Sequence, residues 1–112
     1  MADGPRAKEA RPATYAFHAQ QAVEKFLKAV LVAHDVAPPD TPDIRVLSIL
    51  IEAHTPHELP EHLYHDAALL TRYEMKFSRP TELGAVTEDE LDFAVSTARH
   101  IQDWTFDTLS IG

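Results

Sequence analysis

The strongest structural signal in this 112-residue chain is the stretch His18-Ala-Gln-Gln-Ala-Val-Glu-Lys-Phe-Leu-Lys-Ala-Val-Leu31. It contains no glycine or proline, and helical spacing gathers its polar side chains in one arc. Apolar residues fill most of the remaining circumference, so this helix should lie at the centre of a bundle or be covered both by its own chain and by a partner. The polar arc consists of His18, Gln21, Glu24, Lys25 and Lys28.

The composition is that of one small globular domain, because 112 residues with 45% hydrophobic content can bury a core without cross-links. The absence of cysteine excludes disulfides and thiolate metal sites. The net charge of -8 argues against coating nucleic acid by bulk charge, although a local basic patch is compatible with it. We expect a cytoplasmic protein, since no apolar run has the length of a membrane span and residues 1–11 lack the apolar core of a secretory signal.

Prolines and glycines divide the chain into four predicted helices. Residues 1–12 are expected to form a flexible N-terminal segment, and residues 13–112 the domain. The first helix should run from about residue 13 to residue 34, where a loop with adjacent prolines follows. No segment alternates polar and apolar residues over a useful length, so no strand is predicted.

The second helix is predicted from Thr41, Pro42 and Asp43, which suit an N-cap, a proline at the first helical position and an acidic first turn. It should end near His54, before the next proline. Its apolar stripe should consist of Ile44, Leu47 and Ile51, widened by Val46, Ile49 and Leu50.

The third helix should begin at residue 58 or 61 and end near Tyr73, and a loop is expected over residues 75–86. Thr87, followed three residues later by Glu90, forms a capping box that begins the last helix. Four antiparallel helices with short links predict an all-α, up-and-down four-helix bundle. The predicted buried residues of these two helices are Leu63, Ala67, Leu70, Leu91, Val95, Ala98 and Ile101, with either Trp104 or Thr105 in addition.

The stretch 17–29, Phe-His-Ala-Gln-Gln-Ala-Val-Glu-Lys-Phe-Leu-Lys-Ala, resembles the first helix of the HEPN domain family (higher eukaryotes and prokaryotes nucleotide-binding). Thr41-Pro-Asp-Ile stands where the family has Thr-His-Asp-Leu, and Arg72-Tyr73 is similar to its Arg-Tyr pair; the resemblance covers roughly residues 15–106. It implies a four-helix bundle that commonly forms homodimers. Members are often encoded beside a small nucleotidyltransferase and act with it as a toxin–antitoxin-like module.

Many members of this family are ribonucleases whose R-x4-6-H motif lies near the last helix, with the histidine moving a proton and the arginine holding a phosphate. The only late histidine here is His100, directly after Arg99, so the motif is missing at that place. Arg11 and His18 have a permitted spacing, but they lie at the N-terminus on either side of Pro12. We therefore assign no catalytic residue and favour a binding protein over an enzyme.

The first group of candidate ligand-binding residues is the polar arc, with Gln21, Glu24, Lys25 and Lys28 able to contact a phosphate, a base or a partner. The structural alternative is a solvated stripe in which Glu24 and Lys28 form an ion pair one turn apart. Gln20 lies inside the apolar arc, so it should be hydrogen-bonded in a packed site or at a dimer contact.

The second candidate group is Arg72 and Tyr73 at the end of the third helix, where Lys76 and Arg79 complete a basic cluster. An arginine at this place can bind a phosphate through its planar fork. It can also simply complement the helix dipole.

Four histidines between residues 54 and 65 suggest a metal site. The segment from His57 to His62 has a residue too many for the H-E-x-x-H motif and contains Pro60, so the two imidazoles would not lie one turn apart. We expect surface histidines around a turn, with no metal and no cofactor.

With the missing ribonuclease motif, the resemblance implies a non-catalytic HEPN-type binding protein that forms a homodimer. As the family implies, it would be the partner of a minimal nucleotidyltransferase in a toxin–antitoxin-like module and would bind nucleotide or RNA. Two alternatives stay open: a ribonuclease toxin with a divergent active site, and a structural adaptor with no small ligand.

Overall fold

The computed structural model describes residues 5–78 and 85–110, with side chains from residue 12 to residue 73 and from residue 85 to residue 110. Within these ranges the chain is helical and has no strand, which confirms the predicted all-α class. None of the described helices combines the length and the apolar character that a membrane crossing requires. The four helices are α1 (Pro5–Ala33), α2 (Ile44–His54), α3 (Glu61–Ser78) and α5 (Glu88–Leu109).

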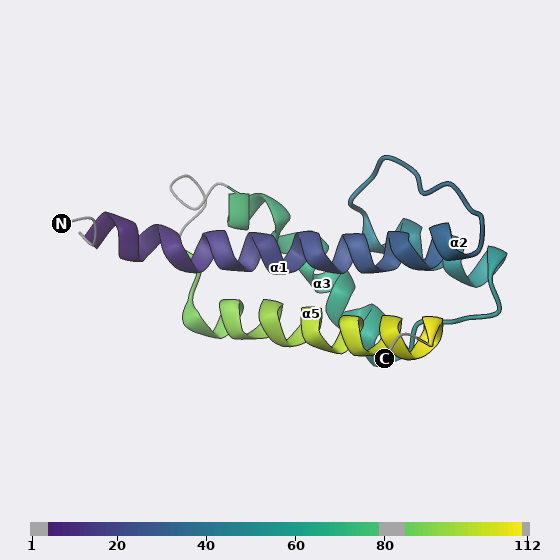
Figure 1. Ribbon diagram of the computed structural model, residues 1–112. Helices are drawn as coiled ribbons and strands as arrows, with labels where there is room; N and C mark the ends of the chain where they lie inside the picture. Colours follow the sequence, from purple (N-terminus) through teal and green to yellow (C-terminus); the bar gives the residue numbers. More distant parts are fainter. Residues whose placement is uncertain (1–4, 79–84, 111–112) are drawn as a thin grey trace.

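Helix α1 is central, because it contacts each of the other three helices. Figure 1 shows α5 running along one side of it, with α2 and α3 behind. Its side chains Val23, Leu27, Val30 and Leu31 have no exposed surface. The wide apolar arc is thus divided among three neighbours, which confirms the predicted central position of this helix.

The helices do not alternate strictly in direction. Phe26, late in α1, meets Phe106, late in α5, with ring centroids 6.1 Å apart. The two helices therefore run the same way, as Figure 1 also shows. His34, just after α1, lies 4.9 Å between ring centroids from His57, just after α2, so α2 is also parallel to α1. The predicted up-and-down alternation therefore does not describe α1, α2 and α5.

The length of the link between α1 and α2 allows these two helices to be parallel rather than antiparallel. The chain leaves α1 through Asp35, whose φ of 61° is in the left-handed region. The ten residues 34–43 can span up to ~33 Å, whereas the 11 residues of α2 are only ~16 Å long. The chain therefore returns along α1 before α2 begins, in the long loop of Figure 1. Helix α3 then runs antiparallel to α2, since the Ile44 N–H at the start of α2 donates to Thr71 Oγ1 late in α3 (3.5 Å).

Two helices extend beyond their predicted ends. Helix α1 begins at Pro5 rather than near residue 13 and includes Pro12. Helix α3 continues to Ser78, into the segment predicted as a loop. The reason is that the first proline after α3 begins is Pro80, which disfavours helical backbone only from the residue before it. The flexibility expected of residues 1–12 stays a prediction.

The caps of α2 and α5 are formed by short polar side chains. Asp43 rather than Thr41 caps α2, with Asp43 Oδ1 accepting the Arg45 N–H at 3.0 Å. Thr41 Oγ1 instead accepts the N–H of Asp43 (3.2 Å). The capping box of α5 is confirmed, because Thr87 Oγ1 accepts the Glu90 N–H at 3.1 Å and Glu90 Oε1 accepts the Thr87 N–H at 2.9 Å.

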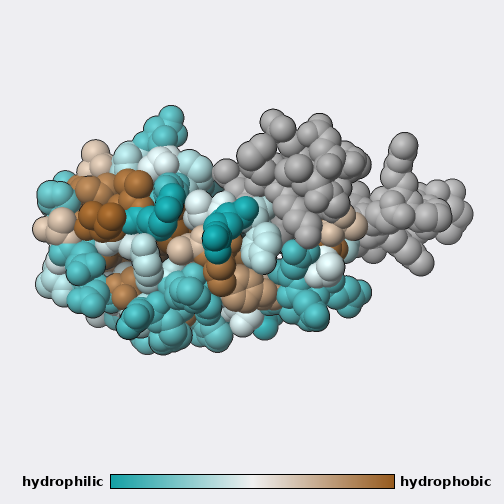
Figure 2. Space-filling view, turned by 180° about the vertical axis from the view of Figure 1, so that it is seen from behind, coloured by the Kyte–Doolittle hydropathy of each residue, from teal (hydrophilic) through white to brown (hydrophobic). Residues whose placement is uncertain are grey.

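The apolar stripe of α2 is confirmed, because Ile44, Leu47 and Ile51 are fully buried. The two residues expected to widen it lie outside the core, with Val46 38% and Ile49 62% exposed. Figure 2 views the molecule from the α2 and α3 side and shows hydrophobic surface gathered at the end that α2 forms.

The buried face of α3 is also confirmed, and that of α5 is confirmed in part. Leu63, Ala67 and Leu70 are buried in α3 as predicted. Ile101 is fully buried in α5, and of the alternatives Trp104 and Thr105 it is Thr105 that is buried. The other predicted positions, Leu91, Val95 and Ala98, are partly exposed. Ala94 and Thr97 complete the buried face of α5.

Candidate functional site

A basic hollow lies where the first turn of α2 meets the second half of α3. Its volume is about 470 Å³. Arg45 enters it from α2 and is exposed, as are His65 and Arg72 on α3. The remaining lining residues are Ala68, Leu69 and Thr71. We call this surface the basic hollow.

Helical spacing and one contact between the helices assemble the hollow. His65 and Arg72 are seven residues apart on α3, which is close to two turns and places both on one face. Thr71 Oγ1 accepts the backbone N–H of Ile44 (3.5 Å), so the start of α2 is held beside α3. Arg45 follows Ile44 in the chain and lines the same hollow as Arg72.

Arg45 is held by a bidentate ion pair. Its Nε and Nη2 donate to Asp43 Oδ1 and Oδ2 at 3.2 and 3.0 Å. The side-chain hydrogen bond from Arg45 is the main reason why the pKa of the Asp43 carboxyl is lowered. The same hydrogen bond and the negative charge of Asp43 raise the pKa of the Arg45 guanidinium. Arg45 thus stays charged and keeps N–H donors beyond the two that Asp43 accepts.

Arg72 is differently placed, since it forms no ion pair or hydrogen bond with any residue that the structure describes. Its guanidinium carries five N–H donors in a planar fork. Two guanidinium groups, an imidazole and a threonine around one hollow form a surface that can bind an anion with several oxygen acceptors, such as a phosphate.

The comparisons with known proteins agree with this helical architecture. The family model described as "HEPN domain" matches residues 6–108. The chain belongs to the HEPN family. Among curated proteins and among solved structures, no match to it was found. The family match confirms the resemblance carried by residues 17–29 and places the chain in a family that is generally related to nucleotides or RNA.

In this HEPN domain Arg72 and Tyr73, which were predicted as one candidate group, lie on different surfaces. Arg72 faces α2 in the basic hollow, whereas Tyr73 is partly buried against the core. Tyr73 lines a different depression toward α5, together with Leu69, Asp89, Glu90 and Phe93. Successive residues of a helix point about 100° apart, so adjacent positions in the sequence do not share a face. The side chains of Lys76 and Arg79, which completed the predicted basic cluster, lie outside the described residues.

The polar arc of α1 is a separate surface. Lys28 Nζ lies 2.8 Å from Glu24 Oε2, so these two residues form the ion pair of the structural alternative. Gln21 is partly buried and Lys25 is exposed, and no residue of the arc lines the basic hollow. Gln20 is 4% exposed, as expected of the apolar arc, but its Oε1 accepts no hydrogen bond from the described residues.

The histidines of residues 54–65 lie at different places in the structure. His57 packs edge-on against His34, whose Nδ1 lies 2.9 Å from Val30 O. His62 is exposed at the start of α3, and His65 belongs to the basic hollow. Among the described residues no group of three or more histidine, aspartate or glutamate side chains is placed to hold a metal ion.

Arg45 and His65 are the functional candidates that the sequence reasoning missed. His65 could have been found from its spacing of seven residues from Arg72 on one helix. Arg45 had no such signal, because it is 27 residues from Arg72 and only the pairing of α2 with α3 brings the two together.

Proposed function

We propose that this HEPN domain binds a phosphate group of a nucleotide or an RNA in the basic hollow and does not transform it. The observation that supports this most directly is the Arg72 guanidinium, which has no partner among the described residues and lies beside Arg45. Charge-assisted hydrogen bonds between a guanidinium and a phosphate are among the strongest that side chains form. A local site of this kind is compatible with a net charge of -8, because it does not depend on bulk charge.

The ion pair between Asp43 and Arg45 supports a binding role. A guanidinium that is already oriented loses less side-chain freedom when a ligand binds. Asp43 also lies at the rim of the site and repels anions that approach Arg45 from its side. We therefore expect an anion to enter the basic hollow from the side of Arg72, away from the negative charge of Asp43.

The placement of the late arginine and histidine supports binding without cleavage. Arg99 and His100 are adjacent in α5 and both exposed, so they point about 100° apart. Acid–base cleavage needs an imidazole within hydrogen-bond reach of the bound phosphate. His65 lines the basic hollow together with Arg45 and Arg72, which makes it the residue to test for the ribonuclease alternative.

We further propose that the domain works in the cytoplasm as a homodimer and as the non-catalytic partner of a small nucleotidyltransferase in a toxin–antitoxin-like module. The exposed apolar side chains Tyr15, Val32 and Ile49 supply surface that a partner protein can cover. A structural adaptor without a small ligand would use this apolar surface and leave the basic hollow empty.

The test is a calorimetric titration of the protein with ATP and with a short single-stranded RNA, followed by an RNA-cleavage assay on the same sample. The variant Arg72→Ala should weaken binding about tenfold, since it removes charged hydrogen bonds to the phosphate. The matched control is Arg99→Ala, which removes an exposed arginine of α5 and should leave binding unchanged. Added salt should weaken binding as well.

Two results would overturn the proposal. Undiminished affinity in Arg72→Ala, or no binding of either ligand, would leave the adaptor as the better description. RNA cleavage that disappears in His65→Ala would establish the ribonuclease instead.

A further inference from the structure

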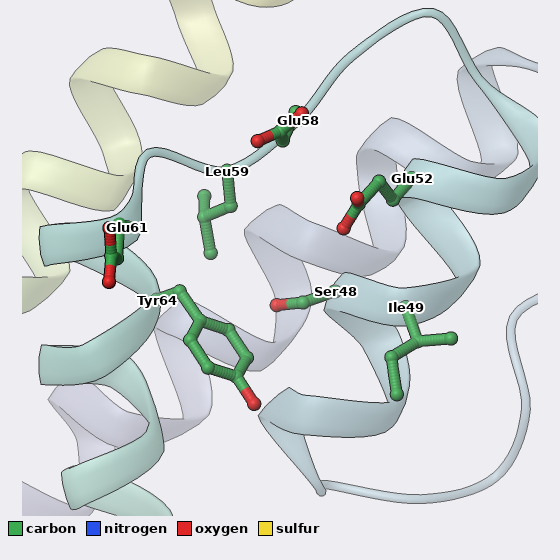
Figure 3. A pocket seen from close by; sticks show the side chains of 7 residues that line it. All are labelled: Ser48, Ile49, Glu52, Glu58, Leu59, Glu61 and Tyr64. Carbon is green, nitrogen blue, oxygen red and sulfur yellow. The ribbon is translucent and has the colours of Figure 1, made fainter.

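A second hollow, of opposite charge, lies between the second half of α2, the link after it and the start of α3 (Figure 3). Its volume is about 340 Å³. Glu52 of α2, Glu58 of the link and Glu61 of α3 line it, and each is exposed. None of these three glutamates forms an ion pair or hydrogen bond with a residue that the structure describes. We call this surface the acidic pocket.

A buried hydroxyl distinguishes the acidic pocket from an ordinary cluster of surface carboxylates. Ser48 lines the pocket and is only 7% exposed, and its Oγ has no hydrogen-bond partner among the described residues. Serine inside a helix commonly bonds to the carbonyl one turn before it, and Ser48 does not. Figure 3 shows its hydroxyl directed from α2 toward the space between Leu59 and Tyr64. A buried polar group without a partner is rare and destabilising, which points to a ligand that completes its hydrogen bonding.

The rest of the pocket is apolar. Leu59 is buried, and Ile49 and the ring of Tyr64 stand on either side of the opening in Figure 3. These side chains can cover the methylene groups of an alkyl chain, as the stems of lysine and arginine are covered on protein surfaces. The described residues contain no cluster arranged to hold a metal ion, so the geometry favours an organic cation over a divalent metal.

We propose that the acidic pocket binds an alkylammonium or alkylguanidinium group. The alkyl chain lies between Ile49 and Tyr64, the cation lies among the three glutamates, and Ser48 Oγ accepts one of its N–H groups. Two sources carry this chemistry: a free polyamine-like molecule, and a lysine or arginine side chain of a partner protein. The proposal does not depend on phosphate binding, because the basic hollow is lined by other residues.

The experiment titrates the full chain with two probes and follows backbone amide shifts by NMR. Butylguanidinium represents the free cation, and the capped peptide acetyl-Gly-Arg-Gly-amide represents a protein side chain; each probe carries one positive charge. We expect saturable binding with a Kd of about 1 mM, as is typical for a small ligand with one charged group. Tighter binding of butylguanidinium identifies a small molecule as the natural source, and tighter binding of the peptide identifies a partner side chain.

Two variants and two controls make the test specific. Glu52→Gln combined with Glu58→Gln keeps the shape of both exposed side chains and should weaken binding about fivefold. Ser48→Ala should also weaken binding while raising Tm, because it removes the buried hydroxyl that has no partner. Asp92→Asn removes an exposed carboxylate of α5, and Arg72→Ala tests the basic hollow. Both controls should leave probe binding unchanged.

The proposal is overturned if neither probe saturates. It is also overturned if Asp92→Asn weakens binding as much as the pocket variants do, since the attraction would then be the general negative charge of the protein. Loss of ATP and RNA binding in Arg72→Ala with undiminished butylguanidinium binding would keep the two sites distinct.

Discussion

Asp43 connects the start of a helix with the candidate site. Its Oδ1 caps α2 through the Arg45 N–H, and both carboxylate oxygens accept hydrogen bonds from the Arg45 guanidinium. The same side chain therefore begins the helix and orients an arginine of the basic hollow. Thr41 offers a similar capping oxygen two residues earlier, but a helix that began at Pro42 would leave Asp43 unable to do both.

The stabilising effect of Asp43 should depend on pH. Its pKa is lowered from the ordinary value of 3.8, chiefly by the hydrogen bond from Arg45, so folding favours the charged carboxylate. The resulting stability is present above that value and is lost as the pH falls through the lowered pKa of the folded state. Asp43→Ala should reduce the free energy of unfolding by about 1 kcal/mol at pH 7, through the lost cap.

The measurement is thermal unfolding of Asp43→Ala and of the wild-type protein between pH 7 and pH 3, where the difference in stability should shrink toward the acidic end. Asp40→Ala is the matched control, because Asp40 is an exposed aspartate of the preceding link. A constant difference over the whole range would contradict a role for the ionised carboxylate.

Residues of α1 show which side-chain interactions local sequence patterns can predict and which they cannot. Glu24 and Lys28 form the ion pair that their spacing predicts, because both positions lie on one helix. Gln20 shows the opposite case. Its burial follows from its place in the apolar arc, whereas its unpaired Oε1 depends on which groups the other helices bring near it.

At the scale of elements, α5 is the helix whose first residue the sequence predicts most clearly. Thr87 and Glu90 satisfy each other's backbone N–H groups, and acidic residues fill the first turn, where the helix dipole favours negative charge. This helix packs along the length of α1, so its start also positions a large part of the core.

Removing the capping side chain should therefore destabilise the whole domain. Thr87→Ala should lower the free energy of unfolding by about 1 kcal/mol in urea denaturation, because the N–H of Glu90 loses the Thr87 hydroxyl that accepts its hydrogen bond. The control is Ser96→Ala in the exposed middle of α5, where alanine has the higher helix propensity and no loss is expected. Equal stability of Thr87→Ala and wild type would mean that the first turn contributes little to global folding.

At the scale of the whole molecule, the pairing of α2 with α3 creates two surfaces of opposite charge. Arg45 and Glu52 are seven residues apart in α2, a separation of about 10 Å along its axis. The basic hollow therefore lies toward the start of α2 and the acidic pocket toward its end, where exposed Ile49 lines the pocket. A protein of net charge -8 thus presents a basic surface at one defined place.

The exposed apolar surface of α2 should take part in the proposed homodimer. Light scattering coupled to size-exclusion chromatography should show a dimer for the wild type and a monomer for Ile49→Asp, because an interface disfavours an unpaired buried charge. Ile49 is 62% exposed, so the variant should still fold. Ala29→Asp is the matched control on α1, where alanine is exposed and belongs to none of the proposed surfaces. A wild-type monomer, or a dimer that survives Ile49→Asp, would place the contact elsewhere or exclude it.

Local patterns alone were sufficient for the four helices, the central place of α1 and the buried stripe of α2, because helix formation and amphipathic burial depend on residues a few positions apart. Arg72 was predicted as a basic candidate on a helix in the same way, although α3 extends six residues beyond it, to Ser78, rather than ending there. The direction of α2 and the meeting of Arg45 with Arg72 were decided only by the tertiary structure. A ten-residue link is long enough to place α2 either parallel or antiparallel to α1, and the packing of the core decides between these two directions. Contacts between residues 27 positions apart form only in the arrangement that the core selects.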